Sequence, residues 1–171
     1  MITIHEKAEK MLKESNFKIF KHKKLLCCVQ RLSWSGHLCG YVAVDKNNSL
    51  YGKKYSDTIE LEKEPKFNEN YIGLLIHSLK DRKDNEYSLD LAINVHCGLT
   101  YSRNELNGLE KNIFGDLWWF GFDTGHSEDL KPFQTDIDRK YPYNECTYKD
   151  FEFVENETKK LAEQLSKFNN K

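Results

Sequence analysis

Two short segments of the chain gather side chains that could bind a ligand or carry out chemistry. The segment VHCGLTYS, residues 95–102, combines His96 with a glycine and three hydroxyl side chains. The segment WWFGFDTGHSED, residues 118–129, combines aromatic rings with Asp123, His126 and Asp129. Imidazoles, carboxylates and hydroxyls donate and accept hydrogen bonds, and aromatic rings form the apolar walls of many small-molecule sites. We therefore expect a ligand site where the two segments meet.

The expected ligand is nucleotide-like, because the segments supply both a stacking ring and hydrogen-bond donors. Trp119 would stack on a base, and Asp123 would accept a hydrogen bond from a sugar hydroxyl or a base amine. Neighbouring acids repel a polyphosphate, so we expect a ligand with few charges. The predicted ligand-binding residues are His96, Thr100, Tyr101, Ser102, Arg103, Trp119, Asp123, His126 and Asp129.

A metal site is an alternative for the same residues. His96, His126, Asp123 and Asp129 are of types that bind transition metals. However, the spacing Asp123-x-x-His126-x-x-Asp129 is not diagnostic of zinc. The sequence therefore predicts no metal ion and no cofactor.

Nucleophilic catalysis would need a serine or cysteine beside a base. Cys97 follows His96 directly, but adjacent residues of a strand point to opposite faces of the sheet. We therefore expect Cys97 to be a core residue, and no catalytic residue is assigned.

The elements that must position these residues are strands between two terminal helices. The segments 25–32, 38–44, 87–97 and 117–123 have strand-like patterns, and the best alternation runs through 87–97. In 117–123, Trp119 and Asp123 share one face, across a glycine that leaves room for close approach to the backbone. The short connection from Ser102 to Asp116 permits an antiparallel pair that brings 96–102 and 117–126 together. The segment 69–80 fits a helix or a strand equally well.

Helical patterns lie at the two ends. Thr3 and Glu6 have capping-box spacing before a short amphipathic stripe. Thr147 and Asp150 have the same spacing, and apolar residues then recur at steps of three and four from Phe151 to Phe168. The fold class expected is α+β, a mostly antiparallel sheet with N- and C-terminal helices packed on it, and residues 1–171 form one domain.

Composition excludes several classes of partner. The net charge is −1, so no overall positive field recruits nucleic acid, and no apolar run is long enough to cross a membrane. The five cysteines include no CxxC pair, and the N-terminus lacks the apolar run of a signal peptide. We expect a cytoplasmic protein with reduced thiols that binds no nucleic acid and no membrane, and a homo-oligomer is compatible with the sequence.

Four segments resemble a family of small uncharacterised phage and prophage proteins. They are CGYVAV…LYGKKY (39–55), VHCGLTYS (95–102), WWFGFDTGHSED (118–129) and YKDFEFVENETKKLAEQL (148–165). The family's segments are similar to CGYV, LYG, HGGLTYS and WWFGFD followed by spaced His and Asp residues. Cys97 stands where the family pattern has a glycine. The resemblance implies a phage or prophage setting, with a host-cell cytoplasmic location, and it implies no activity.

Three functions fit these observations. The first is a phage-type binding protein that sequesters a nucleotide-derived immune signal without turnover. The second is a hydrolase with His96 or His126 as general base and Asp123 as orienting group or metal ligand. The third is a surface inhibitor of a host protein, in which the motif residues serve only the fold. The sequence favours them in that order.

Overall fold

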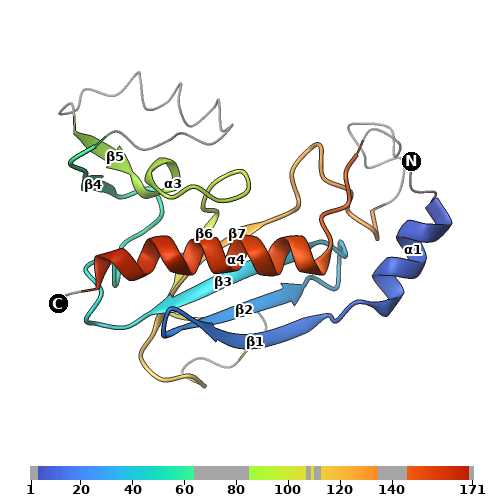
Figure 1. The fold of residues 1–171 in the computed structure, drawn as a ribbon, viewed down its shortest axis with the longest axis horizontal. Helices are drawn as coiled ribbons and strands as arrows, with labels where there is room; N and C mark the ends of the chain where they lie inside the picture. Colours follow the sequence, from blue (N-terminus) through green and yellow to red (C-terminus); the bar gives the residue numbers. More distant parts are fainter. Residues whose placement is uncertain (1–3, 64–84, 107–108, 110–112, 135–145, 170–171) are drawn as a thin grey trace.

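The chain folds around a five-stranded antiparallel sheet with the strand order β1-β2-β3-β7-β6 (Figure 1). The computed structural model describes residues 4–63, 85–106, 109, 113–134 and 146–169. The sheet strands are β1 (Phe17–His22), β2 (Leu25–Arg31), β3 (Leu38–Val44), β6 (Tyr101–Arg103) and β7 (Trp118–Asp123). The other elements are α1 (Ile4–Lys13), β4 (Thr58–Glu60), β5 (Glu86–Ser88), α3 (Leu89–Ala92) and α4 (Phe151–Leu165), which a 3-10 turn (Ser166–Phe168) extends. The α+β prediction is confirmed.

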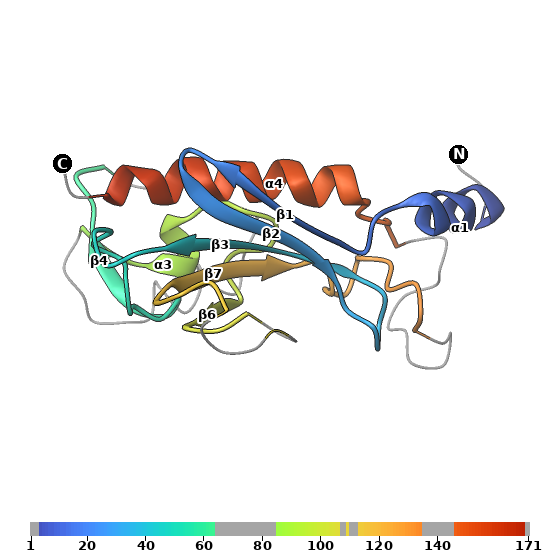
Figure 2. The same ribbon diagram turned by 90° about the horizontal axis from the view of Figure 1, so that it is seen from below.

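Helix α4 covers one face of the sheet, as the sequence predicts (Figure 2). Val154, Leu161 and Leu165 are fully buried against strand residues such as Val42 and Phe120. Gly40 permits this close packing, because a Cβ there would lie 2.2 Å from the Thr158 hydroxyl. The apolar stripe of the C-terminal segment is therefore the face that packs on the sheet. Its helix begins at Phe151, and the N-cap is Asp150, which accepts a hydrogen bond from Phe153 N.

The opposite face of the sheet carries a second apolar cluster. Its buried members are Cys28, Cys39, Tyr41, Ala43, Leu106 and Trp119. The predicted strand alternation is confirmed here, since Trp119 and Asp123 lie on this face while Phe120 and Phe122 face α4. The ring of Tyr41 occupies the space beside Gly121, because a Cβ at this position would lie 2.4 Å from that ring.

The edge strand β1 is missing from the sequence prediction. Its lysines break the apolar pattern, although lysine is common on edge strands, where it opposes pairing with other chains. Lys23 and Lys24 join β1 to β2 in a two-residue turn with positive φ angles of 50° and 65°. Such turns usually contain Asn-Gly, so the Lys-Lys pair gives no sequence signal for a hairpin.

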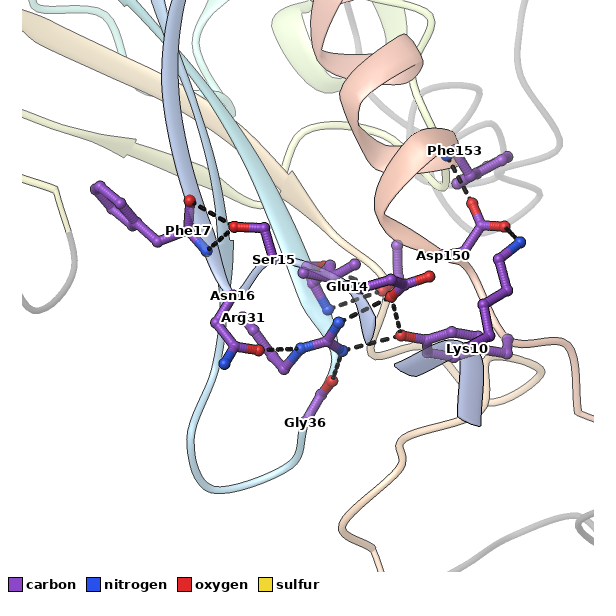
Figure 3. Close-up of polar contacts among 12 residues, drawn as sticks. Lys10, Glu14, Ser15, Asn16, Phe17, Arg31, Gly36, Asp150 and Phe153 are labelled. Carbon is purple, nitrogen blue, oxygen red and sulfur yellow. Dashed lines mark hydrogen bonds and ion pairs between the residues drawn. The ribbon is translucent and has the colours of Figure 1, made fainter. Parts of the chain in front are cut away.

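Helix α1 lies beyond the end of the sheet, close to the N-terminal end of α4 (Figures 1 and 2). Polar contacts join this region to the sheet (Figure 3). The buried guanidinium of Arg31 donates hydrogen bonds to Glu14 Oε2 at 2.9 Å, to Asn16 Oδ1 at 2.8 Å and to the carbonyl of Gly36 at 2.8 Å. The predicted cap at Thr3 lies outside the described residues.

The predicted strand over 87–97 is wrong beyond its first residues. Strand β5 covers Glu86–Ser88, helix α3 covers Leu89–Ala92, and a loop follows. Leu89, Leu91, Ile93 and Val95 are nevertheless buried in alternation. An alternating pattern indicates which side chains are buried, not which element buries them. Here a helical turn and a loop bury these four side chains, as a strand would.

The predicted pairing of the two site segments is confirmed. Tyr101, Ser102 and Arg103 pair with Gly121, Phe120 and Trp119 in antiparallel register. The ambiguous segment 69–80 lies outside the described residues. Within the part of the chain that the structure describes, no helix is both long and apolar enough to span a membrane.

Candidate functional site

His96, Cys97, His126 and Asp129 form a compact group, here called the histidine cluster. His96 and Cys97 lie in the loop before β6, and His126 and Asp129 lie in the turn after β7. The loop reverses at Cys97 and Gly98, which have φ angles of 52° and 88°, and Gly98 N donates to the carbonyl of Val95 at 3.0 Å. The cluster is therefore held by both chain segments that the sequence singles out.

Asp129 is the centre of this cluster. Its Oδ2 atom accepts hydrogen bonds from His96 Nε2 at 2.8 Å, His126 Nδ1 at 3.2 Å and the backbone N–H of His126 at 3.3 Å. Asp129 is only 4% exposed, so its charge is compensated by these donors rather than by water. Its backbone is fixed as well, because Leu130 N donates to Thr147 O and Thr147 N donates to Glu128 O.

The cluster shifts the acid–base equilibria of all four side chains. Burial alone would lower the pKa of His96, but its contacts with Asp129 and Cys97 raise it to about 9. Hydrogen bonds with Asp129 and Cys97 raise the pKa of His126 to about 10. Burial alone would raise the pKa of Asp129, but bonds from His126 and His96 hold it well below its usual range.

Cys97 takes part in this network, contrary to the sequence prediction of a core residue. It is exposed, while the other four cysteines are buried. Its Sγ atom lies 3.7 Å from His96 Nε2, and contacts with His126 and His96 lower the pKa of the thiol to about 7. The prediction is wrong because it assumes a strand, whereas Cys97 lies in a loop and has a left-handed backbone conformation.

A cleft of about 310 Å³ lies beside the cluster. The residues lining it are Leu32, Trp34, His37, Cys39, Tyr41, Thr100, Tyr101, Phe122, Asp123, Gly125 and Lys131. Trp34 is 73% exposed, and the centroid of its ring lies 5.6 Å from that of His37, edge to face. The cleft thus combines aromatic rings with a carboxylate, a hydroxyl and a lysine, the composition expected of a small-molecule site.

Asp123 is the best-placed acceptor in the cleft. Its Oδ2 accepts from the Thr100 hydroxyl at 2.7 Å, and its Oδ1 accepts from Gly125 N at 2.8 Å. Each carboxylate oxygen has capacity for a further hydrogen bond, and the side chain is 29% exposed. Burial lowers the pKa of His37. The charges of Asp123, Asp129 and His126 also influence this pKa. Cleft and cluster are therefore neighbours.

The structure divides the predicted site residues into three groups. Thr100, Tyr101 and Asp123 line the cleft, and His96, His126 and Asp129 belong to the cluster. Ser102, Arg103 and Trp119 lie elsewhere. Ser102 accepts a hydrogen bond from Tyr55 N, and Arg103 is solvent-exposed beside Glu105.

Trp119, which the sequence predicts as a stacking ring, is buried in this structure. It is 2% exposed and packs against Phe114 in the second apolar cluster. The segment after β6 contributes Leu106 to the same cluster. Trp34 is the aromatic side chain that reaches the cleft instead.

The ligand-binding residues predicted from the sequence do not include Trp34, Lys131 or Cys97. His37 and Tyr41 also line the cleft. The available signal for Trp34 is its place in Ser33-Trp34-Ser35-Gly36, a turn between two strands that leaves a large ring on the surface. Comparison of the chain with protein-family models, curated proteins and solved structures finds no match.

Proposed function

We propose that the protein binds a small nucleotide-like ligand in the cleft and holds it without turnover. The observation that carries this proposal is the exposed ring of Trp34 at a cleft that also contains Asp123 and Lys131. A large aromatic ring gains little by facing water, and stacking on a base would bury it. The cleft volume of about 310 Å³ lies at the lower end of the range for ligand pockets.

The lining residues match the parts of such a ligand. Trp34 offers a stacking face, Asp123 accepts from a base amine or ribose hydroxyl, and Lys131 offers positive charge to one phosphate. One lysine beside one carboxylate suits a ligand of low charge. A cyclic dinucleotide or an ADP-ribose derivative fits this chemistry better than a nucleoside triphosphate.

The resemblance to phage proteins supports a biological setting for binding without turnover. A phage benefits when a nucleotide-derived immune signal of its host is removed from solution. Tight binding achieves this without a catalytic group, provided that the protein is abundant relative to the signal.

Hydrolysis of the bound ligand is the second candidate function. It is favoured by the closeness of the histidine cluster to the cleft, because His126 and Asp129 influence the pKa of His37. A histidine beside a bound phosphoester could serve as a general acid or base. The two candidates differ only in whether the ligand leaves intact.

Calorimetry against a panel of cyclic dinucleotides and ADP-ribose derivatives tests the proposal, with chromatography of the recovered ligand. We expect binding that weakens about ten- to a hundredfold in Trp34→Ala, the usual cost of a lost stacking ring. Asp123→Ala should also weaken binding. Tyr55→Ala is the matched control, because Tyr55 is a partly exposed aromatic residue outside the cleft lining.

Three results would contradict the proposal. Equal affinity in Trp34→Ala and wild type would place the ligand elsewhere. Recovery of cleaved ligand would establish the hydrolase. Absence of binding across the panel would favour the surface inhibitor.

A further inference from the structure

We infer that His96, Cys97 and His126 form a binding site for a zinc-like transition-metal ion, beside the buried carboxylate of Asp129. Ligand atoms of His96, Cys97 and His126 all lie within 4.8 Å of one another. Asp129 Oδ2 lies 2.8 Å from His96 Nε2 and 3.2 Å from His126 Nδ1. The spacing along the chain predicts no such site, because its donors come from two segments that meet only in the folded protein.

The distances within the cluster suit one small ion. Ligand atoms bound at about 2.0–2.3 Å to one tetrahedral zinc ion lie about 3.3–3.8 Å from each other. The distance of 3.7 Å between Cys97 Sγ and His96 Nε2 lies in this range. The distance of 2.8 Å between Asp129 Oδ2 and His96 Nε2 is that of a hydrogen bond, so Asp129 holds the imidazole in place.

The chemistry of the donors selects the class of metal. Two imidazole nitrogens and one thiolate form a mixed set of borderline and soft ligands. Such a set favours zinc and its first-row neighbours, whereas magnesium and calcium prefer oxygen ligands only. On binding, the ion would take the place of the protons that the two histidines share with Asp129 and Cys97, so binding should release protons.

The surrounding fold holds these donors before any metal arrives. The ring of Phe153, in the first turn of α4, packs edge to face on His96 at 5.5 Å. The backbone bridge between Asp129 and Thr147 fixes the turn that carries the carboxylate. The left-handed backbone at Cys97 places its sulfur beside His96. Pre-positioned donors lose little freedom on metal binding, which favours affinity.

The metal site does not depend on the proposed ligand of the cleft.

The test of the metal site uses the full chain, which is freed of metal with a chelator and then titrated with Co²⁺. We expect one equivalent to give the visible bands of tetrahedral cobalt and a near-ultraviolet thiolate charge-transfer band. Zn²⁺ should then displace the cobalt, because zinc binds more tightly than cobalt to such ligands.

Variants assign the ion to these residues. His126→Ala and His96→Ala should each weaken metal binding by more than about tenfold. Loss of a residue that only hydrogen-bonds to a metal ligand already weakens metal binding by about tenfold or more. Cys97→Gly should lose the charge-transfer band while keeping the fold, because glycine accepts the φ angle of 52° readily. His22→Ala is the control, since His22 pairs with Glu163 on the protein surface, away from the cluster.

Alkylation gives a readout that does not depend on the spectrum of the ion. Cys97 is exposed and the other four cysteines are buried, so iodoacetamide should label one position in the folded protein. Zn²⁺ should slow this labelling in wild type and in His22→Ala, but not in His126→Ala. The inference is overturned if no tetrahedral cobalt spectrum appears, or if His126→Ala binds cobalt as tightly as wild type.

Discussion

The Oδ2 atom of Asp129 lies 2.8 Å from Nε2 of His96, a residue 33 positions earlier in the chain. This contact joins the loop before β6 to the turn after β7. Because Asp129 is almost completely buried, the contact fixes both segments relative to the sheet. The geometry of the histidine cluster depends on this contact.

Removing the charge of Asp129 should destabilise the fold and release the histidines. Asp129→Asn leaves His96 and His126 without their carboxylate partner, which we expect to cost about 2–3 kcal/mol in the free energy of unfolding. This loss of stability is smaller than the loss expected for a fully buried ion pair, because both histidines are partly exposed. The pKa of His126, now about 10, should fall toward its ordinary value. Urea unfolding and NMR titration of metal-free protein measure the two effects.

Glu128→Gln is the control for Asp129→Asn. Glu128 is adjacent in sequence, but its side chain is exposed, so the change should stay within about 0.5 kcal/mol. If the two variants unfold at the same urea concentration, Asp129 does not anchor the cluster.

The N-cap of α4 should contribute a pH-dependent part of the stability. Asp150→Ala should cost about 1 kcal/mol, because Phe153 N loses its acceptor. Asp150→Asn should retain most of the cap at neutral pH. Burial alone would raise the pKa of Asp150, but hydrogen bonds from Lys10 and Phe153 N lower it.

The sign of the pH effect follows from that lowered pKa. A carboxyl whose pKa is lower in the folded state stabilises the protein above its unfolded value of about 4, and this stabilisation is lost as the pH falls. The stability difference between wild type and Asp150→Asn should therefore shrink between about pH 5 and pH 2. A difference that stays constant over this range in urea unfolding would show that the charge of Asp150 does not contribute.

The turn between β1 and β2 should be improved by glycine. Lys24 has a φ of 65°, a conformation that costs an ordinary side chain about 1 kcal/mol. We expect Lys24→Gly to raise the free energy of unfolding by about 0.5 kcal/mol, after the greater freedom of glycine in the unfolded chain is subtracted.

Lys21→Gly is the matched control in the same hairpin. Lys21 lies within β1, so glycine should destabilise the protein by about 0.5–1 kcal/mol. Thermal unfolding of the two variants should therefore shift in opposite directions. Equal destabilisation would contradict the left-handed conformation at Lys24.

The sequence predicted the sheet better than the site. Strands β2, β3 and β7 carry patterns that a buried strand requires, and α4 carries a clear apolar stripe, so local patterns identified them. The site depends on features without a local signature. The left-handed backbone at Cys97 exposes its thiol, and the apolar cover of Trp119 hides the ring that the sequence favours. Trp34 lines the cleft from a turn that is far in sequence from the two site segments. Only the folded structure shows that this turn lies beside them.

Native mass spectrometry of the protein recovered from phage-infected or immune-signalling cells tests the proposed binding function most directly. We expect a complex whose added mass matches one nucleotide-like molecule per cleft. The ligand released on denaturation should be intact, and Trp34→Ala protein from the same cells should carry much less of it. The proposed binding function would be contradicted if wild-type protein carried no added organic mass, or if Trp34→Ala protein carried as much ligand as wild type.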